Sequence, residues 1–254
     1  MRFGILFSIL TLVTSFNINN LVNKINPYNE KRISKNIIYL DNSEKNANFL
    51  FLPPKFKQYN SYAGYQTFIN ELNKYGNVII GDNINENDIE NYENITLISH
   101  SISAREGIEL SKLENIKNLV LIDPINIGNY ENSNKINYNN ITDINKIDSQ
   151  IDDYTIANLD NFIYIDFKLS NKWQMIPFVV PIGILKLKLK DININENISV
   201  INKNVDLYGH FDIMDENWSN FFHNSLSKGS KDRDSERLNL LNNWLITTIN
   251  DIIN

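Results

Sequence analysis

Short, uncharged apolar runs alternate along this chain with longer stretches in which apolar residues recur at helical spacing. The first runs lie at residues 49–52, 78–80 and 95–98. A short, continuous apolar run indicates a strand that is buried on both faces, which is typical of a parallel sheet. The helical stretches between the runs supply the crossovers that parallel strands require. The pattern therefore predicts an α/β fold with a mainly parallel sheet and helices on both of its faces.

The remaining apolar patterns extend this alternation to the C-terminus. Further strands are expected at residues 119–122, 162–166, 185–190 and 198–207. Helices are expected at residues 62–75, 108–113 and 238–252. The strand at 185–190 is predicted to be half-buried, because Leu and Lys alternate there. Residues 126–160 are rich in Asn and weakly patterned, so we expect a loop or a cap insertion.

The size and composition of the chain favour a single folded domain. A length of 254 residues with 42% apolar residues is sufficient for one large core. We expect this domain to span residues 49–254. Residues 16–48 before it are mostly polar, and the short apolar piece at 37–40 is interpreted as an edge strand.

The first 15 residues have the organisation of a secretory signal peptide. Arg2 supplies one positive charge, residues 3–13 are mostly apolar, and small residues follow up to Ser15. A membrane-spanning helix needs about 20 apolar residues, so this run is too short for an anchor. We therefore expect cleavage before Phe16 and a mature protein without a transmembrane anchor. The predicted location is outside the cell or in the lumen of the secretory pathway.

Charge and cysteine content exclude several classes of function. The net charge is −6 with 24 Lys and Arg residues and no long basic run, which argues against binding to nucleic acid. The absence of Cys excludes disulfides, thiolate zinc sites, iron–sulfur clusters and a cysteine nucleophile. No metal or cofactor is expected. Any mechanism that needs an imidazole must use His100, His210 or His223.

A candidate nucleophile follows the apolar run at 95–98, where the chain turns through Ser101 into a helix. Such a sharp strand-to-helix turn, the nucleophile elbow, lifts a serine hydroxyl above the sheet. It needs small residues two positions before and after the nucleophile, and these positions hold Ser99 and Ser103. Glycine is usual there, so both serines depart from the pattern. The setting predicts Ser101 as the nucleophile.

A serine hydroxyl needs a base, and position in the chain favours one of the three histidines. His210 follows the last predicted strand, in a loop that begins with Gly209. An α/β-hydrolase carries its histidine in such a loop. His100 adjoins Ser101, and neighbouring side chains on a sharp turn diverge, so we expect it to pack beside the elbow. His223 lies in a segment without a turn signal.

Two carboxylates are candidates for the third member of a triad. The acid must hold the second nitrogen of the imidazole, and the expected chain order is serine, acid, histidine. Asp123 ends the predicted strand after the elbow helix, and Asp166 ends the next one. Both belong to the carboxyl edge of the sheet, where ligands bind. Reasoning from the residues alone leaves both open.

Three of these segments resemble the chlorophyllase family of α/β-hydrolases. The family's elbow, Gly-His-Ser-x-Gly-Gly, corresponds to Ser-His-Ser-Ile-Ser-Ala at residues 99–104. Its Asp-Pro-Val after an apolar strand corresponds to Asp-Pro-Ile at 123–125, and its Tyr-Gly-His-Met-Asp-Met-Leu-Asp to Tyr-Gly-His-Phe-Asp-Ile-Met-Asp at 208–215. The tail at 228–237 is also similar, and the resemblance runs from about residue 48 to the C-terminus.

The resemblance implies a single-domain α/β-hydrolase fold and a Ser-His-Asp triad in which Asp123 is the acid. The family's His-Gly-Phe oxyanion turn is replaced by Pro53, Pro54 and Lys55. Proline has no N–H, so the backbone N–H of Lys55 is the expected donor from this turn. The second donor is the N–H of Ile102, after the nucleophile.

Two functions fit these residues. The first is a secreted serine esterase or lipase that cleaves a carboxylic ester, with an apolar small molecule as the expected substrate. The second is a catalytically inactive relative that binds an apolar ligand or a protein partner, suggested by the replaced glycines and the altered oxyanion turn. The apolar segment at 178–185 is expected near the pocket mouth, where it either packs into the core or lines an apolar acyl pocket.

Overall fold

A computed structural model provides the architecture of the chain. It describes residues 30–34, 37–42, 44–54, 64–81, 84–126, 154–172, 174–175, 180–181, 185–225, 227–228 and 235–253. The predicted signal peptide, Lys55 and most of the segment at 178–185 lie outside these residues.

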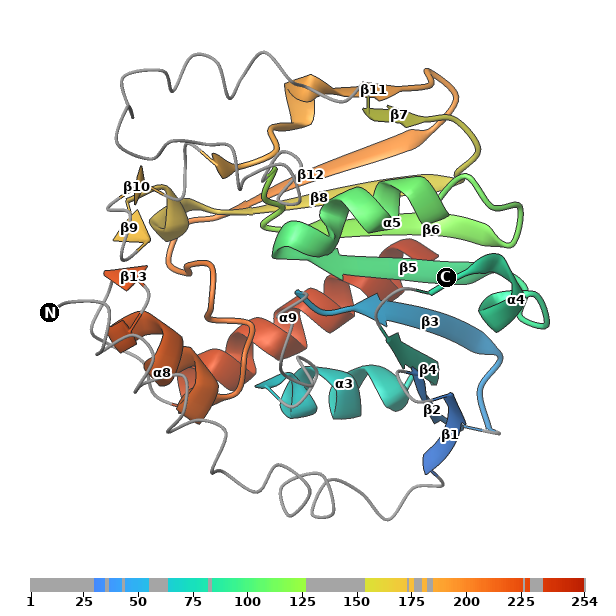
Figure 1. The fold of residues 1–254 in the computed structure, drawn as a ribbon, viewed down its shortest axis with the longest axis horizontal. Coiled ribbons are helices and arrows are strands. Elements are labelled where there is room, and N and C mark those ends of the chain that lie inside the picture. The colour runs from blue at the N-terminus through green and yellow to red at the C-terminus, as the bar shows by residue number, and fades with distance from the viewer. Residues whose placement is uncertain are drawn as a thin grey trace, which may run out of the picture.

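A central sheet dominates the described part of the chain (Figure 1). Its eight strands have the order β1-β2-β4-β3-β5-β6-β8-β12 within the described residues. In chain order they are β1 (Glu30–Ser34), β2 (Ile37–Leu40), β3 (Ala47–Leu52), β4 (Gly76–Gly81), β5 (Ile95–His100), β6 (Ile116–Ile122), β8 (Asn161–Phe167) and β12 (Ser199–Val205). All neighbours from β4 to β12 pair in parallel, whereas β1 pairs with β2, and β2 with β4, in antiparallel fashion.

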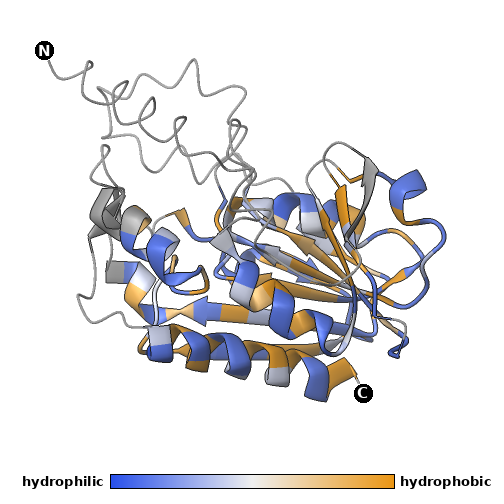
Figure 2. Ribbon diagram, turned by 90° about the horizontal axis from the view of Figure 1, so that it is seen from below, coloured by the Kyte–Doolittle hydropathy of each residue, from blue (hydrophilic) through white to orange (hydrophobic). Residues whose placement is uncertain are grey.

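Helices cover both faces of this sheet. The elements are α3 (Gln66–Asn73), α4 (Glu86–Ile89), α5 (Ala104–Leu110), α8 (Glu216–Ser225) and α9 (Ser235–Ile253). In Figure 1, α5 lies in front of the strands and α9 passes behind them. In Figure 2 the strands are mostly orange, while the helix that ends at the C-terminus alternates blue and orange along its length. This alternation is typical of a helix that buries one face.

The two faces of the sheet carry separate apolar cores. Phe49 and Phe51 of β3 pack in one core with α3 and α9. Leu50 and Leu52 pack in the other, which includes Ile108 of α5. Successive side chains of a strand point to opposite faces, so a continuous apolar run fills both cores at once. The strands predicted at 49–52, 78–80, 95–98, 119–122 and 162–166 are confirmed as parts of β3, β4, β5, β6 and β8. The strand predicted at 198–207 is confirmed as β12, which is shorter at both ends.

The prediction for residues 185–190 was wrong. Lys186 forms only an isolated bridge with Ile125, and the short 3-10 helix η7 (Leu189–Asp191) follows. Lys186 is buried, although alternation with Leu would place it on a solvent face. The physical reason is that buried carboxylates bind its ammonium group, which a local hydropathy pattern does not register.

Two other regions differ from expectation. β7 (Tyr154–Ile156) lies inside the predicted loop at 126–160 and pairs in parallel with β11 (Ile192–Ile194). β1 pairs along the outer side of β2, so β2 is one strand in from the edge. The polar sequence of β1 carries no signal of a strand, because an antiparallel edge needs no apolar run.

Smaller elements complete the described structure. β9 (Gln174–Met175), β10 (Val180–Pro181) and β13 (Ser227–Lys228) form a three-stranded sheet. The 3-10 helices η2 (Ser101–Ser103) and η6 (Lys168–Lys172) follow β5 and β8. Among the helices that are described, none is both long and apolar enough to span a membrane.

Candidate active site

The turn after β5 has the construction of a nucleophile elbow. β5 is buried along its whole length and runs directly into η2, whose first residue is Ser101. Ser101 has a φ of 62°, in the left-handed region that side chains other than glycine rarely adopt. Residues are held in such conformations chiefly at functional sites, because the strain costs about 1–3 kcal/mol. The strain at Ser101 therefore marks the turn as a candidate site.

The serine at position 99 is accommodated by a glycine on the facing helix. A Cβ atom added to Gly107 of α5 would lie 2.1 Å from Ser99 Oγ and 3.0 Å from Ser99 Cβ. The glycine that an elbow usually has in the strand is thus replaced by Gly107 in the helix, and β5 and α5 still pack closely. Ser103, the second departure, donates a hydrogen bond from its Oγ to the carbonyl of Pro53 at 2.6 Å.

Ser101, His210 and Asp123 form one continuous chain of hydrogen bonds. The distance from Ser101 Oγ to His210 Nε2 is 2.7 Å, and the distance from His210 Nδ1 to Asp123 Oδ2 is 2.6 Å. An ionised carboxylate only accepts hydrogen bonds, so His210 donates from Nδ1 and leaves Nε2 to accept from the Ser101 hydroxyl. The neutral imidazole is thereby held in the tautomer that can take a proton from serine.

Asp123 directly follows β6, is fully buried, and is contacted by four donors of the described residues. Besides His210, it accepts hydrogen bonds from the backbone N–H of Phe167 at 3.0 Å and from Ser170 Oγ at 3.2 Å. Lys186 Nζ lies 2.6 Å from its Oδ1. Burial alone would raise the pKa of Asp123, but hydrogen bonds and charge from His210 and Lys186 hold it well below its usual range. The group is therefore a carboxylate at neutral pH.

The structure separates the two candidate acids. Asp166 in β8 pairs with Lys186 and, through Oδ2 at 2.7 Å, with Lys168. The carboxylate that contacts His210 is that of Asp123. Asp123, like Ser101, has a positive φ, of 42°.

The loop that carries His210 is fixed by its own aspartates. Asp212 Oδ2 accepts from the N–H of Gly209 at 2.8 Å, which closes a tight turn around His210. Asp215 accepts from the N–H groups of Gln66 at 2.8 Å and Thr67 at 2.9 Å, in the first turn of α3. A carboxylate is stabilised there by unpaired N–H groups and the helix dipole. The histidine loop is thereby tied to α3.

His100 packs beside the elbow, as expected from its position. Its Nε2 lies 3.0 Å from the carbonyl oxygen of His210, and its Nδ1 lies 2.7 Å from Tyr65 Oη. A carbonyl only accepts, so Nε2 carries the proton and Nδ1 accepts from the tyrosine. Burial, together with the neighbouring His210, lowers the pKa of His100 well below its usual range. His100 is therefore a neutral structural link between the elbow and the histidine loop. His223 lies on α8.

The two predicted oxyanion donors have different outcomes. Lys55 lies outside the described residues. Ile102 is the second residue of η2, in the first helical turn, where N–H groups have no acceptor within the helix. Its N–H directly follows Ser101, at the position where a nucleophile elbow carries an oxyanion donor.

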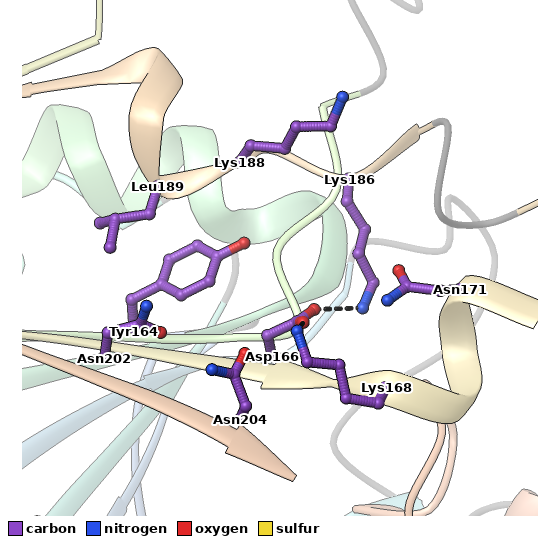
Figure 3. A pocket seen from close by; sticks show the side chains of 9 residues that line it. All are labelled: Tyr164, Asp166, Lys168, Asn171, Lys186, Lys188, Leu189, Asn202 and Asn204. Atoms are coloured by element: carbon purple, nitrogen blue, oxygen red, sulfur yellow. Dashed lines mark hydrogen bonds and ion pairs between the residues drawn. The ribbon is translucent and has the colours of Figure 1, made fainter. Parts of the chain in front are cut away.

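Lys186 was missed by sequence reasoning, because the alternation of Leu and Lys indicated an exposed side chain. Lys186, which contacts Asp123, lies at a cavity of about 270 Å³. The residues that line this cavity are Tyr164, Asp166, Lys168, Asn171, Lys186, Lys188, Leu189, Asn202 and Asn204. In Figure 3, Lys186 and Lys168 reach toward Asp166, while Lys188 points away.

No group of three or more His, Cys, Asp or Glu side chains suited to a metal ion occurs in the described part of the chain.

The comparisons with known proteins give a likeness in fold. No family profile and no curated protein sequence matches this chain. The solved structure of α/β-hydrolase domain-containing protein 10 from mouse is 11% identical, with a TM-score of 0.50 over 90% of this chain and 98% of that one. MenH from S. aureus is 12% identical, with a TM-score of 0.41 over 75% of this chain and 97% of that one.

The topology agrees with the likeness to the mouse protein. A mainly parallel sheet is covered by helices on both faces, and Ser101, Asp123 and His210 follow β5, β6 and β12 in the chain order of that fold. This protein has the α/β-hydrolase fold.

Proposed function

We propose that this protein is a serine hydrolase that cleaves carboxylic esters through an acyl-enzyme. The observation that supports this most directly is the unbroken contact from Ser101 through His210 to Asp123, at 2.7 and 2.6 Å. Both distances lie within the range that proton transfer requires. The strained backbone of Ser101 also supports a catalytic role for this residue, because strain of this kind costs free energy and clusters at active sites.

In the proposed reaction, Ser101 Oγ attacks the ester carbonyl while its proton moves to His210 Nε2. Asp123, ionised and buried, stabilises the resulting imidazolium and keeps its orientation. The N–H of Ile102, with that of Lys55 as the expected second donor, stabilises the oxyanion. The alcohol leaves with the proton from His210. Water then hydrolyses the acyl-enzyme by the same steps, and the carboxylic acid is released.

The resemblance to chlorophyllases supports an ester with an apolar group as the substrate. We also propose, from the N-terminal pattern, that the protein enters the secretory pathway. Expression of the full chain in a secreting host, followed by sequencing of the mature N-terminus, tests this. Cleavage before Phe16 is expected, and an uncleaved Met1 would contradict it.

An inactive relative that binds an apolar ligand is the competing interpretation. The replaced elbow glycines and the altered oxyanion turn suggest it. Gly107 provides the space that Ser99 takes up. Lys55 of the oxyanion turn lies outside the described residues. Labelling with a fluorophosphonate probe distinguishes the two. We expect labelling of the wild type and none of Ser101→Ala. A wild type that stays unlabelled, with a folded circular dichroism spectrum, would favour the inactive relative.

Once the wild type labels, p-nitrophenyl esters of graded chain length identify the acyl preference. We expect kcat/KM to rise from acetyl toward longer acyl groups, since the proposed substrate is apolar. A preference for acetyl esters would contradict this part of the proposal.

A further inference from the structure

Lys186 is a buried lysine whose three N–H donors all have acceptors. Its Nζ contacts Asp123 Oδ1 at 2.6 Å, the carbonyl of Phe167 at 2.8 Å, and Asp166 Oδ1. Its side chain is 4% exposed. An ammonium group carries three protons, so no donor is left for a substrate. Lys186 is therefore held in place by these three oxygen atoms.

The contact with Asp123 restrains the orientation of the triad acid. Oδ2 of that carboxylate faces His210, while Oδ1 is held by Lys186 and by the N–H of Phe167. A rotation of the carboxylate would separate Oδ1 from the ammonium and so disrupt the buried ion pair. The lysine thus keeps one oxygen turned toward the histidine.

Asp166 completes the balance of charge. If Lys186 faced Asp123 alone, its positive charge would offset the negative charge that must stabilise the His210 imidazolium. Asp166 binds the same ammonium, so the cluster of three buried groups, two carboxylates and one lysine, carries a net charge of −1. Lys168 also pairs with Asp166, but its side chain is 41% exposed and solvent screens its charge. Protonation of His210 then brings the cluster to neutrality, and that is favourable in a buried site.

We propose that Lys186 and Asp166 together are positioning residues for Asp123, and that they act on catalysis only through it. This inference rests on the proposed hydrolase function. The lowered pKa of Asp123, to which Lys186 contributes both charge and a hydrogen bond, is consistent with it. Ser170 and Phe167 are neutral partners of the same carboxylate and cannot replace the charge.

A double-mutant cycle tests whether Lys186 and Asp166 affect kcat together. Lys186→Met leaves two buried carboxylates without their shared cation, and Asp166→Asn leaves the lysine with Asp123 alone. We expect each to lower kcat about tenfold, with KM within about twofold of wild type, as for partners in one charge network. The double variant restores the net charge of −1 and should return to within about threefold of wild type.

A purely structural lysine predicts the opposite outcome. The two losses would then add, so that the double variant would be at least as impaired as Lys186→Met. Either that result or an unchanged kcat in Lys186→Met would overturn the proposal. Lys190→Met is the matched control, because it makes the same substitution in the same segment at an exposed side chain. It should have wild-type kcat and KM.

A spectroscopic measurement separates this proposal from the proposed function. The proton between His210 Nδ1 and Asp123 gives a far-downfield NMR signal, assigned by its loss in His210→Ala. We expect the signal in the wild type and in the double variant, and its broadening or loss in Lys186→Met. This holds even if no ester is turned over. If the signal is unchanged in a folded Lys186→Met, the positioning role fails, whatever the wild type hydrolyses.

Discussion

Replacing Gly107 by alanine tests the packing that supports the elbow. The new Cβ would lie 2.1 Å from Ser99 Oγ and 3.0 Å from Ser99 Cβ, whereas carbon atoms pack at about 3.5–4.0 Å. Rotation of the Ser99 hydroxyl relieves the first contact but not the second. Both residues are buried, so α5 must move away from β5.

Two opposing effects set the change in the free energy of unfolding of Gly107→Ala. Overpacking of a buried contact costs about 1–3 kcal/mol, and alanine gains about 1 kcal/mol over glycine inside a helix. We therefore expect Gly107→Ala to lower the free energy of unfolding by up to about 2 kcal/mol. For a domain of this size, each kcal/mol corresponds to a fall in Tm of about 2–4 °C. Without the clash, the substitution would be stabilising.

The compensating variant makes the test specific. In Ser99→Gly/Gly107→Ala the clash is gone, and a hydroxyl that has no hydrogen-bond partner among the described residues is removed. An unsatisfied buried hydroxyl costs about 1–3 kcal/mol, which offsets the cost of glycine in a strand. The double variant should match the wild type in thermal denaturation and in its rate of fluorophosphonate labelling. Glu109→Ala, an exposed change on the same helix, is the control.

A Gly107→Ala variant that is more stable than the wild type, by the roughly 1 kcal/mol that alanine gains over glycine inside a helix, and that labels as fast would contradict this prediction. It would mean that α5 and β5 are not in close contact at Ser99. Failure of the double variant to recover would show that the loss in the single variant has another cause.

Two further predictions concern the supports of the histidine loop. The pKa of His100 is lowered in the folded protein, so below about pH 6.5 the unfolded chain binds one more proton than the folded chain. The free energy of unfolding therefore falls, as the pH is lowered, by up to about 1.4 kcal/mol per pH unit. In His100→Gln this loss should be smaller, as measured by urea denaturation at pH 7 and pH 5. An equal slope in both proteins would contradict the neutral state. Asp215→Ala removes the carboxylate that caps α3. It should lower the free energy of unfolding by about 1–2 kcal/mol, measured by urea denaturation, and slow the labelling of Ser101 by the fluorophosphonate probe. No change in either measurement would mean that this contact does not hold the His210 loop.

The fold could be predicted because its signal is local. In β3, Phe49 and Leu50 point to opposite faces, and each needs an apolar core, so the run itself indicates a central strand. β5, β6 and β8 follow the same rule. The run at 185–190 failed because burial of Lys186 depends on Asp123 and Asp166, which are distant in sequence. A periodicity cannot register such partners.

The candidate site could be predicted only in part for the same reason. Ser101 and His210 each have a local sequence context, but Asp123 and Asp166 both lie at the ends of neighbouring parallel strands. Only the position of the His210 loop separates them, and that position depends on Tyr65, His100 and Asp215. The glycine that replaces those of the elbow, Gly107, lies on the facing helix, where no elbow pattern extends.

The most direct test of the central claim is to locate the acyl group. The wild type is mixed with a p-nitrophenyl ester and quenched in acid within the first turnover, and its peptides are analysed by mass spectrometry. We expect a burst of p-nitrophenol and one acylated peptide, with the acyl group on Ser101, and neither in Ser101→Ala. An acyl group on another residue, or turnover that survives in Ser101→Ala, would contradict it.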